Sequence, residues 1–221
     1  MRLKRLLSIL PVALFCTPLA FADGWSVGIG TGPFVFGDFA RRSIRVGSES
    51  SSHPVTSTLS AATRPGLSVD LQHDLTPALA LGVAATLTEA PLATRRRNGD
   101  NSVSIDAGTI AVGTFSLPLV WRINRSGTFR FHLAAGPAYA AYRIRARAGE
   151  ARVFEGTRDR FGAMGAAGVA WQWTPRFAVE GEISDVVTAS PLERSDFPPS
   201  GSVTIEKPHN VHTTVGLRYR F

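Results

Sequence analysis

Histidines are the first residues to consider, because imidazole can act as a general base or bind a metal near neutral pH. The chain has five of them, His53, His73, His132, His209 and His212. Their spacing is not that of a metal site, and a hydrolytic site would need a serine and an acid beside one histidine. No serine stands two residues from His212 on its own strand face. We therefore expect no catalytic residue, no metal site and no cofactor.

Arginine is the second residue type that suggests chemistry, because its guanidinium can hold a phosphate with two parallel hydrogen bonds. The clusters are Arg41, Arg42 and Arg45; Arg95, Arg96 and Arg97; Arg143, Arg145 and Arg147; and Arg158 and Arg160. If they lie on surface loops, they could bind lipid phosphates or another polyanion. A solvated loop face with no dedicated site is the competing interpretation.

Repeated glycines, including Gly28, Gly30, Gly32 and those from Gly162 to Gly168, could suggest a phosphate-binding loop. Such a loop needs a strand that leads into a helix, and the sequence around these glycines predicts no helix. We interpret them as small residues on the crowded face of β-strands.

The N-terminus is typical of a secretory signal peptide. Basic residues within positions 1–5 precede an apolar run over residues 6–15, and small residues follow up to Ala20-Phe21-Ala22. This run is too short to cross a bilayer as a helix, and the Ala-x-Ala pattern predicts cleavage after Ala22. We expect a signal peptide over residues 1–22 and one domain over residues 23–221. Cys16 could instead mark a lipoprotein, but the bulky Phe15 before it argues against that.

The charge balance excludes some partners. The chain has 24 Lys and Arg against 17 Asp and Glu, and Arg2, Lys4 and Arg5 belong to the predicted signal peptide. The remaining mild excess does not indicate nucleic-acid binding. No cysteine follows Cys16, and no later segment is apolar enough for a membrane helix, so any membrane segments must be strands.

Short turns alternate with longer polar segments along the chain. Turn signals lie at residues 73–77, 124–127 and 174–176, whereas polar stretches cover residues 40–64, 91–101, 147–158 and 188–208. Short turns at one end and long loops at the other are typical of bacterial outer-membrane barrels.

Alternation of apolar and polar residues predicts eight strands. Six of them cover residues 25–30, 67–72, 79–87, 161–173, 177–184 and 211–221; a fourth strand ends over 115–123 and a fifth begins over 129–139. The apolar phase changes near residues 109–110 and 139–142, where we expect β-bulges. The predicted fold is all-β, an eight-stranded antiparallel up-and-down transmembrane β-barrel.

The aromatic residues indicate which face meets lipid. They lie on the apolar parity, close to a short turn or a terminus, and comprise Trp25, Trp121, Phe129, Phe131, Trp171, Trp173, Phe177 and Tyr219. On a closed barrel they would form one girdle at a membrane interface. A soluble sandwich or lipocalin-like barrel would instead bury them in its core.

The opposite parity carries charged and polar residues near the same end: Asp70, Arg122, Arg130, Gln172, Glu180, Glu182, Arg218 and Arg220. In a narrow membrane barrel these side chains point inward and must pair with one another. We expect the two glutamates of the seventh strand to face the two arginines of the eighth. This balance predicts a plugged interior, not a pore.

The opening Trp25-Ser-Val-Gly-Ile-Gly and the ending Val215-Gly-Leu-Arg-Tyr-Arg-Phe221, together with the leader, carry a family resemblance. The chain resembles the small outer-membrane β-barrel family that includes the OmpA transmembrane domain and OmpX. The resemblance implies a location in the bacterial outer membrane, and Phe221 is similar to the C-terminal signal by which the barrel assembly machinery recognises such proteins. Segments 40–64 and 188–208 are long for this family.

These patterns favour a non-enzymatic, monomeric outer-membrane barrel with a structural or surface-interaction role. Its expected partners are outer-membrane lipid and the phosphates of lipopolysaccharide. Three alternatives stay open: a lipid-modifying enzyme similar to the barrel-embedded lipid A deacylases, a narrow solute path, and a secreted soluble ligand-binding barrel.

Overall fold

A computed structural model describes residues 24–46, 53–98, 101–124, 127–146, 155–197 and 201–221. The predicted signal peptide and Arg147 lie outside the described residues. The strands are β1 (Trp25–Phe36), β2 (Ala40–Val46), β3 (His53–Ala61), β4 (Arg64–Asp74), β5 (Leu79–Asn98), β6 (Asn101–Ser116), β7 (Leu119–Arg122), β8 (Phe129–Ala146), β9 (Gly156–Gln172), β10 (Phe177–Thr188), β11 (Ser202–Ile205) and β12 (His209–Arg220). A single turn of 3₁₀ helix covers Arg194–Asp196. Within the described ranges, no helix has the length and apolarity needed to span a bilayer.

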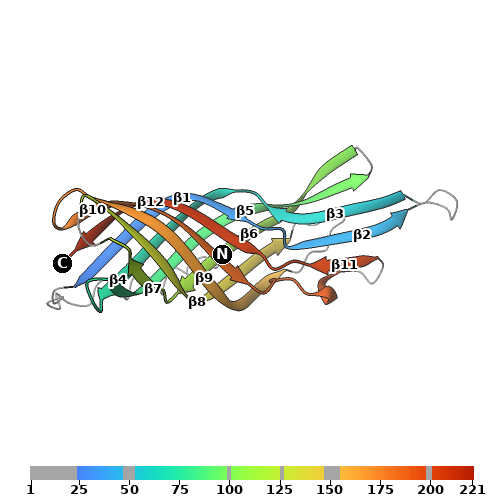
Figure 1. The fold of residues 1–221 in the computed structure, drawn as a ribbon. Coiled ribbons are helices and arrows are strands. Elements are labelled where there is room, and N and C mark those ends of the chain that lie inside the picture. Colours follow the sequence, from blue (N-terminus) through green and yellow to red (C-terminus); the bar gives the residue numbers. More distant parts are fainter. Residues whose placement is uncertain (1–23, 47–52, 99–100, 125–126, 147–154, 198–200) are drawn as a thin grey trace, which may run out of the picture.

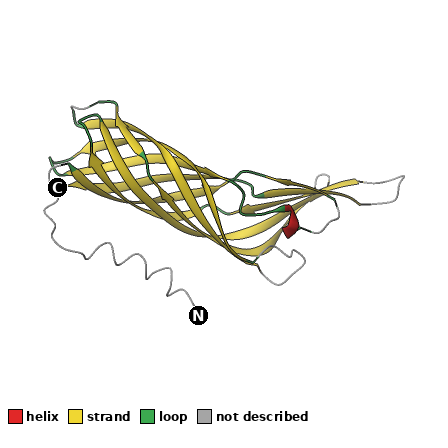
Figure 2. Ribbon diagram, turned by 90° about the horizontal axis from the view of Figure 1, so that it is seen from below, coloured by secondary structure: helices red, strands yellow, loops and turns green. Residues whose placement is uncertain are grey.

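Eight antiparallel positions close into a barrel (Figures 1 and 2). Going round the wall they are β1, β4, β5, the pair β6 and β7, β8, β9, β10 and β12, which returns to β1. The strands β6 and β7 form one wall position interrupted at residues 117–118, where Pro118 has no N–H to donate to the ladder. The predicted eight-stranded barrel is confirmed.

The described residues of the three predicted short turns lie together at one end of the barrel, with the C-terminus, at the left of Figure 1. We call it the turn end. Side-chain caps explain why these turns are tight: the hydroxyl of Thr76 accepts the N–H of Leu79 at 3.0 Å, and that of Thr174 accepts the N–H of Phe177 at 3.0 Å. Short turns of this kind face the periplasm in outer-membrane barrels.

The opposite end, the loop end, contains much more strand than the sequence predicts. Within residues 40–64, β2 and β3 pair as antiparallel strands, and β5 and β6 continue as far as Asn98 and Asn101. These segments join in a sheet that extends from the barrel, with the order β11, β2, β3, β5. The prediction of loops over 40–64 and 91–101 was therefore wrong. These strands lie beyond the lipid belt, where polar side chains on the outer face do not give the apolar alternation that predicts a membrane strand.

Of the two predicted bulges, one is confirmed. Opposite Leu92 and Ala93 of β5, the ladder passes from Gly108 to Asp106, so Ala107 has no partner. Gly108 has a φ of 123°, which glycine tolerates. The second prediction was wrong, because β8 pairs without a register shift from Phe129 to Ile144. The apolar residues change there from odd to even positions because the interior of the barrel becomes apolar.

The interior of the loop end is an apolar core. It is formed by Phe34, Phe36, Phe39, Ala40, Leu59, Ala90, Leu92, Ala107, Ile110, Val112, Ala140, Tyr142, Ile144 and Leu192. Along β8 the even-numbered side chains face inward throughout, so Tyr142 and Ile144 enter this core while Arg143 and Arg145 face outward. The lining thus changes from polar to apolar along the same strand.

Candidate functional site

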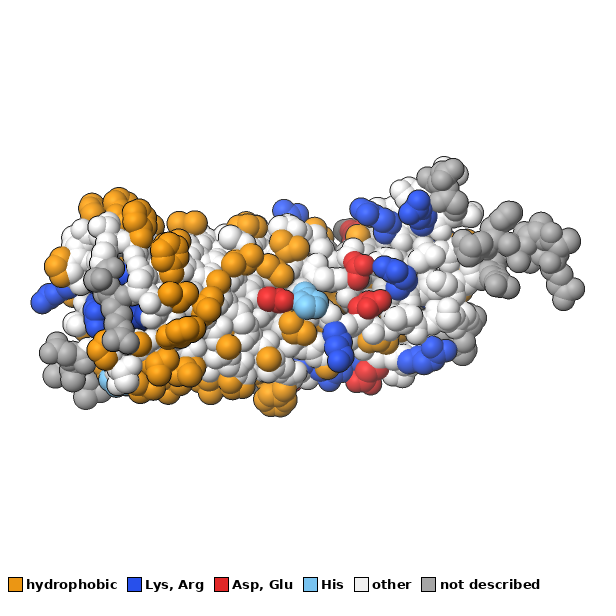
Figure 3. Space-filling view, viewed as in Figure 1, with side chains coloured by type: hydrophobic (Ala, Val, Ile, Leu, Met, Phe, Trp, Pro, Cys, Tyr) orange, Lys and Arg blue, Asp and Glu red, His pale blue; other side chains and the backbone are white. Residues whose placement is uncertain are grey.

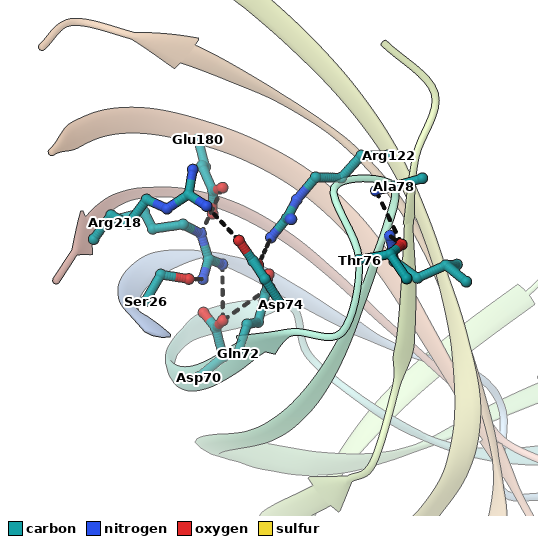
Figure 4. Close-up of polar contacts among 11 residues, drawn as sticks. Ser26, Asp70, Gln72, Asp74, Thr76, Ala78, Arg122, Glu180 and Arg218 are labelled. Atoms are coloured by element: carbon teal, nitrogen blue, oxygen red, sulfur yellow. Dashed lines mark hydrogen bonds and ion pairs between the residues drawn. The ribbon is translucent and has the colours of Figure 1, made fainter. Parts of the chain in front are cut away.

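The interior near the turn end holds an ionic cluster centred on Arg218 (Figure 4). Its Nε lies 2.6 Å from Oε1 of Glu180 on β10, and its Nη2 lies 2.7 Å from Oδ1 of Asp70 on β4. Arg218 also donates to the hydroxyl of Ser26 at 3.2 Å, and the amide of Gln72 donates to Asp70 at 3.1 Å. The Arg218 side chain is 12% exposed. A guanidinium so enclosed needs this set of acceptors.

A second cluster lies closer to the turn end, around Asp74. Arg122 of β7 places Nη2 2.6 Å from one carboxylate oxygen, and Arg220 of β12 pairs with the other. One carboxylate therefore serves two arginines from separate parts of the wall. The even parity of Asp74 matches that of Asp70 and Gln72, so extending the second predicted strand by two residues could have found it.

The remaining predicted interior residues have other partners. Glu182 lies 3.0 Å from Nε2 of His132 and not beside an arginine, and the amide of Gln172 donates to carbonyl oxygens of its own turn, including that of Phe177 at 3.3 Å. Arg130 has a buried Nε without a hydrogen-bond partner. The expected pairing of two glutamates with two arginines holds for Glu180 and Arg218 alone.

The ionic cluster separates two interior cavities. One, of about 70 Å³, lies toward the loop end and is lined by small and hydroxyl side chains, including Ser68, Thr86, Thr114 and Ser116. The other, of about 60 Å³, lies toward the turn end, and five arginines contribute to its lining. Arg218 and Glu180 line both cavities, so the ion pair stands between them.

The loop-end cavity is bounded in turn by the apolar core. A buried polar group marks the transition: Tyr142 shares a 2.7 Å hydrogen bond with Thr188 and accepts another of 2.7 Å from the amide of Asn210. Beyond it, Phe39 is 1% exposed and Leu192 is 2% exposed. Both come from segments between strands, so connecting segments close this end of the barrel. Sequence reasoning missed this closure because it ended the first strand before Phe34.

The outer wall near the turn end is apolar and aromatic. Trp121 is 53% exposed and Trp173 is 69% exposed. The other predicted girdle residues also face outward. The ring centroid of Phe177 lies 4.9 Å from that of Tyr219, with the rings tilted, and the ring of Trp25 lies 4.6 Å from that of His73. Figure 3 shows apolar side chains gathered over the half of the barrel at the turn end and charged side chains over the other half. The turn-end half of the barrel is thus polar inside and apolar outside, which is the arrangement of a wall that faces lipid and which overturns the soluble-barrel alternative.

Comparison with known proteins supports this assignment. No protein-family model matches the sequence, and no curated protein matches it. Among solved structures, the outer membrane protein OprG from Pseudomonas aeruginosa aligns with a TM-score of 0.63 at 12% identity, over 90% of this chain and 96% of OprG. The fold is that of a small outer-membrane β-barrel.

Two further structures align with this barrel. The outer membrane protease OmpT from Escherichia coli has a TM-score of 0.50 at 12% identity, over 90% of this chain and 97% of its own. Neisserial surface protein A has a TM-score of 0.49 at 12% identity, over 90% and 98%. The predicted family resemblance is confirmed at the level of the fold, and the fold and apolar belt support the predicted location in the bacterial outer membrane.

Outward-facing charges show where the apolar belt of the barrel ends. Glu89, Arg143, Asp159, Asp185 and His209 have odd positions on wall strands, on the face that carries the belt residues. Nδ1 of His209 lies 2.6 Å from Oδ2 of Asp185. The distance from the turn-end girdle to these charges along β10, from Phe177 to Asp185, is that of a membrane-spanning strand, about 9–11 residues.

The predicted loop arginines fall into two groups. The first group lies at the loop end and has no ion-pair partner among the described residues: Arg95, Arg96, Arg143 and Arg145. Arg41, also at this end, lies 3.8 Å from Asp38. Arg158 and Arg160, expected in external loops, lie on strand β9 instead. They point inward and hold the segment after β10: Arg158 pairs with Asp196 at 2.7 Å, and Arg160 pairs with Glu193 at 2.8 Å.

No group of three or more histidine, cysteine, aspartate or glutamate side chains in the described part of the barrel could hold a metal ion. The one exposed His and Asp pair, His209 and Asp185, has no serine or threonine hydroxyl in hydrogen-bond contact with the imidazole among the described residues. Such a pair could take a proton from water, but it is not a catalytic triad.

Proposed function

We propose that this protein is a non-enzymatic outer-membrane barrel that holds a β-sheet above the outer leaflet for contact with lipid or other surface molecules. The observation that carries the proposal is the closed loop end. Phe39 and Leu192 complete an apolar core inside the wall, and the strands continue beyond it as the sheet of β11, β2, β3 and β5. This arrangement supports display of a rigid sheet and argues against a path for solutes.

Single-channel recording in planar bilayers tests this role. We expect the wild-type barrel to show no conductance, and the double variant Phe39→Ala/Leu192→Ala to show small openings, because the apolar closure has been cut back. Steady conductance from the wild-type protein would favour the solute-path alternative and contradict the proposal. The variant's heat-modifiable migration on a gel serves as the control for folding.

We propose the phosphates of outer-leaflet lipopolysaccharide as the partner of the outward arginines. Arg143 and Arg145 emerge from β8 where the apolar belt ends, at the height of lipid headgroups, and guanidinium groups bind phosphates well. The test compares binding to lipopolysaccharide with binding to the same lipid after its phosphates are removed. Equal affinity for both would reject this partner, as would unchanged binding by Arg143→Gln/Arg145→Gln.

A lipid-modifying enzyme is the second candidate function, and only one observation favours it. His209 and Asp185 lie on the outer wall beside the upper edge of the belt, where an ester of a lipid could approach. Mass spectrometry of lipids incubated with the wild-type protein and with His209→Ala would distinguish the two candidates. Lipid hydrolysis that disappears in the variant would replace our proposal with the enzymatic one.

A further inference from the structure

The cavity at the turn end has an unusual charge composition. Arginines from β7, β8, the turn before β10 and β12 contribute to its lining: Arg122, Arg130, Arg176, Arg218 and Arg220. The only carboxylate that lines it is Glu180. Arginines enclosed together repel one another, so an arrangement of this kind needs negative charge to offset it.

The carboxylates nearby are already engaged. Glu180 and Asp70 both bind Arg218. Asp74 is shared by Arg122 and Arg220. Glu182 does not line the cavity, and its carboxylate lies 3.0 Å from Nε2 of His132. These contacts account for three of the five arginines.

Arg130 and Arg176 have no carboxylate within ion-pair distance among the described residues. The Nε of Arg130 is buried without any hydrogen-bond partner. An unsatisfied buried donor of a charged group costs free energy and normally finds a partner. Arg176 stands at the exposed edge of the same cavity, and its carbonyl accepts the N–H of Arg220 at 2.8 Å, which fixes the turn against β12.

We propose that this cavity is a binding site for a phosphate group at the periplasmic mouth of the barrel, with Arg130 and Arg176 as its principal ligands. Two guanidiniums with free donors match the charge and the several oxygens of a phosphate better than those of a monovalent carboxylate. The cavity of about 60 Å³ is larger than the ~10–15 Å³ that one water molecule needs, so a small anion has room.

Two sources could supply such a group on this side of the membrane, a phospholipid headgroup of the inner leaflet or free phosphate. The site is independent of the role proposed for the loop end, because the apolar core and the other cavity lie between the site and the sheet at the loop end. Failure of either proposal leaves the other standing.

The test uses the full mature chain refolded in a nonionic maltoside detergent that contains no phosphate. Inorganic phosphate is titrated by calorimetry in one arm, and phosphatidic acid is added to the micelles in the other, with its effect read as a rise in unfolding temperature. Arg130→Gln and Arg176→Gln are compared with Arg64→Gln, which replaces an exposed arginine at the loop end of β4, far from the cavity.

We expect saturable binding of at least one probe, weakened about tenfold or more by Arg130→Gln and by Arg176→Gln, and unchanged by Arg64→Gln. Response to phosphatidic acid alone would identify the lipid headgroup as the source, and response to inorganic phosphate would identify the free ion. Absence of binding by both probes overturns the proposal. So does binding that both cavity variants retain in full. Because Arg176 lies in an exposed turn, its variant keeps the test valid if Arg130→Gln fails to fold.

Discussion

Arg218 and Asp70 meet across the backbone of β1, directly over Gly28. The register places Gly28 opposite Arg218 on one side and opposite Asp70 on the other. A Cβ atom at Gly28 would lie 2.2 Å from Oδ2 of Asp70. The absence of a side chain at this position therefore allows two strands that are not neighbours to form an ion pair.

Replacing Gly28 by alanine should disturb this pair. We expect a loss of about 1–3 kcal/mol in the free energy of unfolding, as for other overpacked interiors. Gly165→Ala is the matched control, because no heavy atom lies within 4 Å of a Cβ at that position. Urea titration of the folded fraction, read from gel migration, measures both variants, and equal losses would refute the explanation.

Replacing Arg218 alone should lower the free energy of unfolding more than replacing Arg218 together with its two carboxylate partners. Arg218→Met leaves Asp70 and Glu180 enclosed without a counter-charge, and we expect a loss of about 3–5 kcal/mol. The triple variant that adds Asp70→Asn and Glu180→Gln should recover much of this loss, because no buried charge remains unpaired. If the triple variant is as unstable as the single one, packing rather than charge explains the effect.

The position of the lipid belt can be tested with arginine on the outer wall. Val215 is 65% exposed near the middle of the belt, and we expect Val215→Arg to cost about 2–4 kcal/mol in a bilayer. Val103 is 59% exposed in the part of β6 beyond the belt, and Val103→Arg should be close to neutral. Folding in lipid vesicles at several urea concentrations gives both values; a neutral Val215→Arg would mean that the belt is misplaced.

Heat-modifiability should depend on detergent. A closed membrane barrel resists denaturation until boiled, so the protein refolded in micelles should migrate faster without boiling than after it. In detergent-free buffer we expect no such band, because the exposed aromatic girdle has no lipid substitute. A folded monomer without detergent would contradict the membrane assignment.

The predicted role of Phe221 in assembly can be separated from a role in stability. Phe221 is 40% exposed and lies edge-on to Tyr219 at 5.1 Å, so it contributes little to the interior. We expect Phe221→Ala to reduce the amount inserted in bacterial outer membranes several-fold and to leave refolding in micelles almost unchanged. Equal defects in both experiments would assign Phe221 to packing alone.

The wall of the barrel could be predicted from the sequence because the side chains of a membrane strand alternate between lipid and the barrel interior, and the residue types alternate with them. Where lipid lies outside and polar groups lie inside, the alternation is strong, as in the run from Phe129 to Leu133 on β8. The same rule fails where water lies outside. There Tyr142 and Ile144 face inward and Arg143 faces outward, so the apolar parity reverses while the strand continues. A reversal of this kind has the same sequence pattern as a bulge.

Pairing between distant side chains was harder to predict. Parity places Arg122, Arg220 and Glu182 inside the barrel, but it does not say which strands lie across the interior from one another. Arg220 thus meets Asp74 and not a glutamate, and Glu182 meets His132. Arg158 and Arg160 were misplaced because the segment that folds back to bind them has no strand pattern of its own.

The extension of β5 past the belt affects how the molecule unfolds. From Glu89 to Asn98 the strand runs for nine more residues, which is about 30 Å along its length, similar to the thickness of a bilayer core. The same polypeptide strands thus cross from a hydrocarbon medium into an aqueous one without a hinge. Denaturant can reach only the aqueous part directly. Since β5 and β6 stay paired on both sides of the bulge at Ala107, we expect fraying to start at the outer tip and stop where the strands enter lipid.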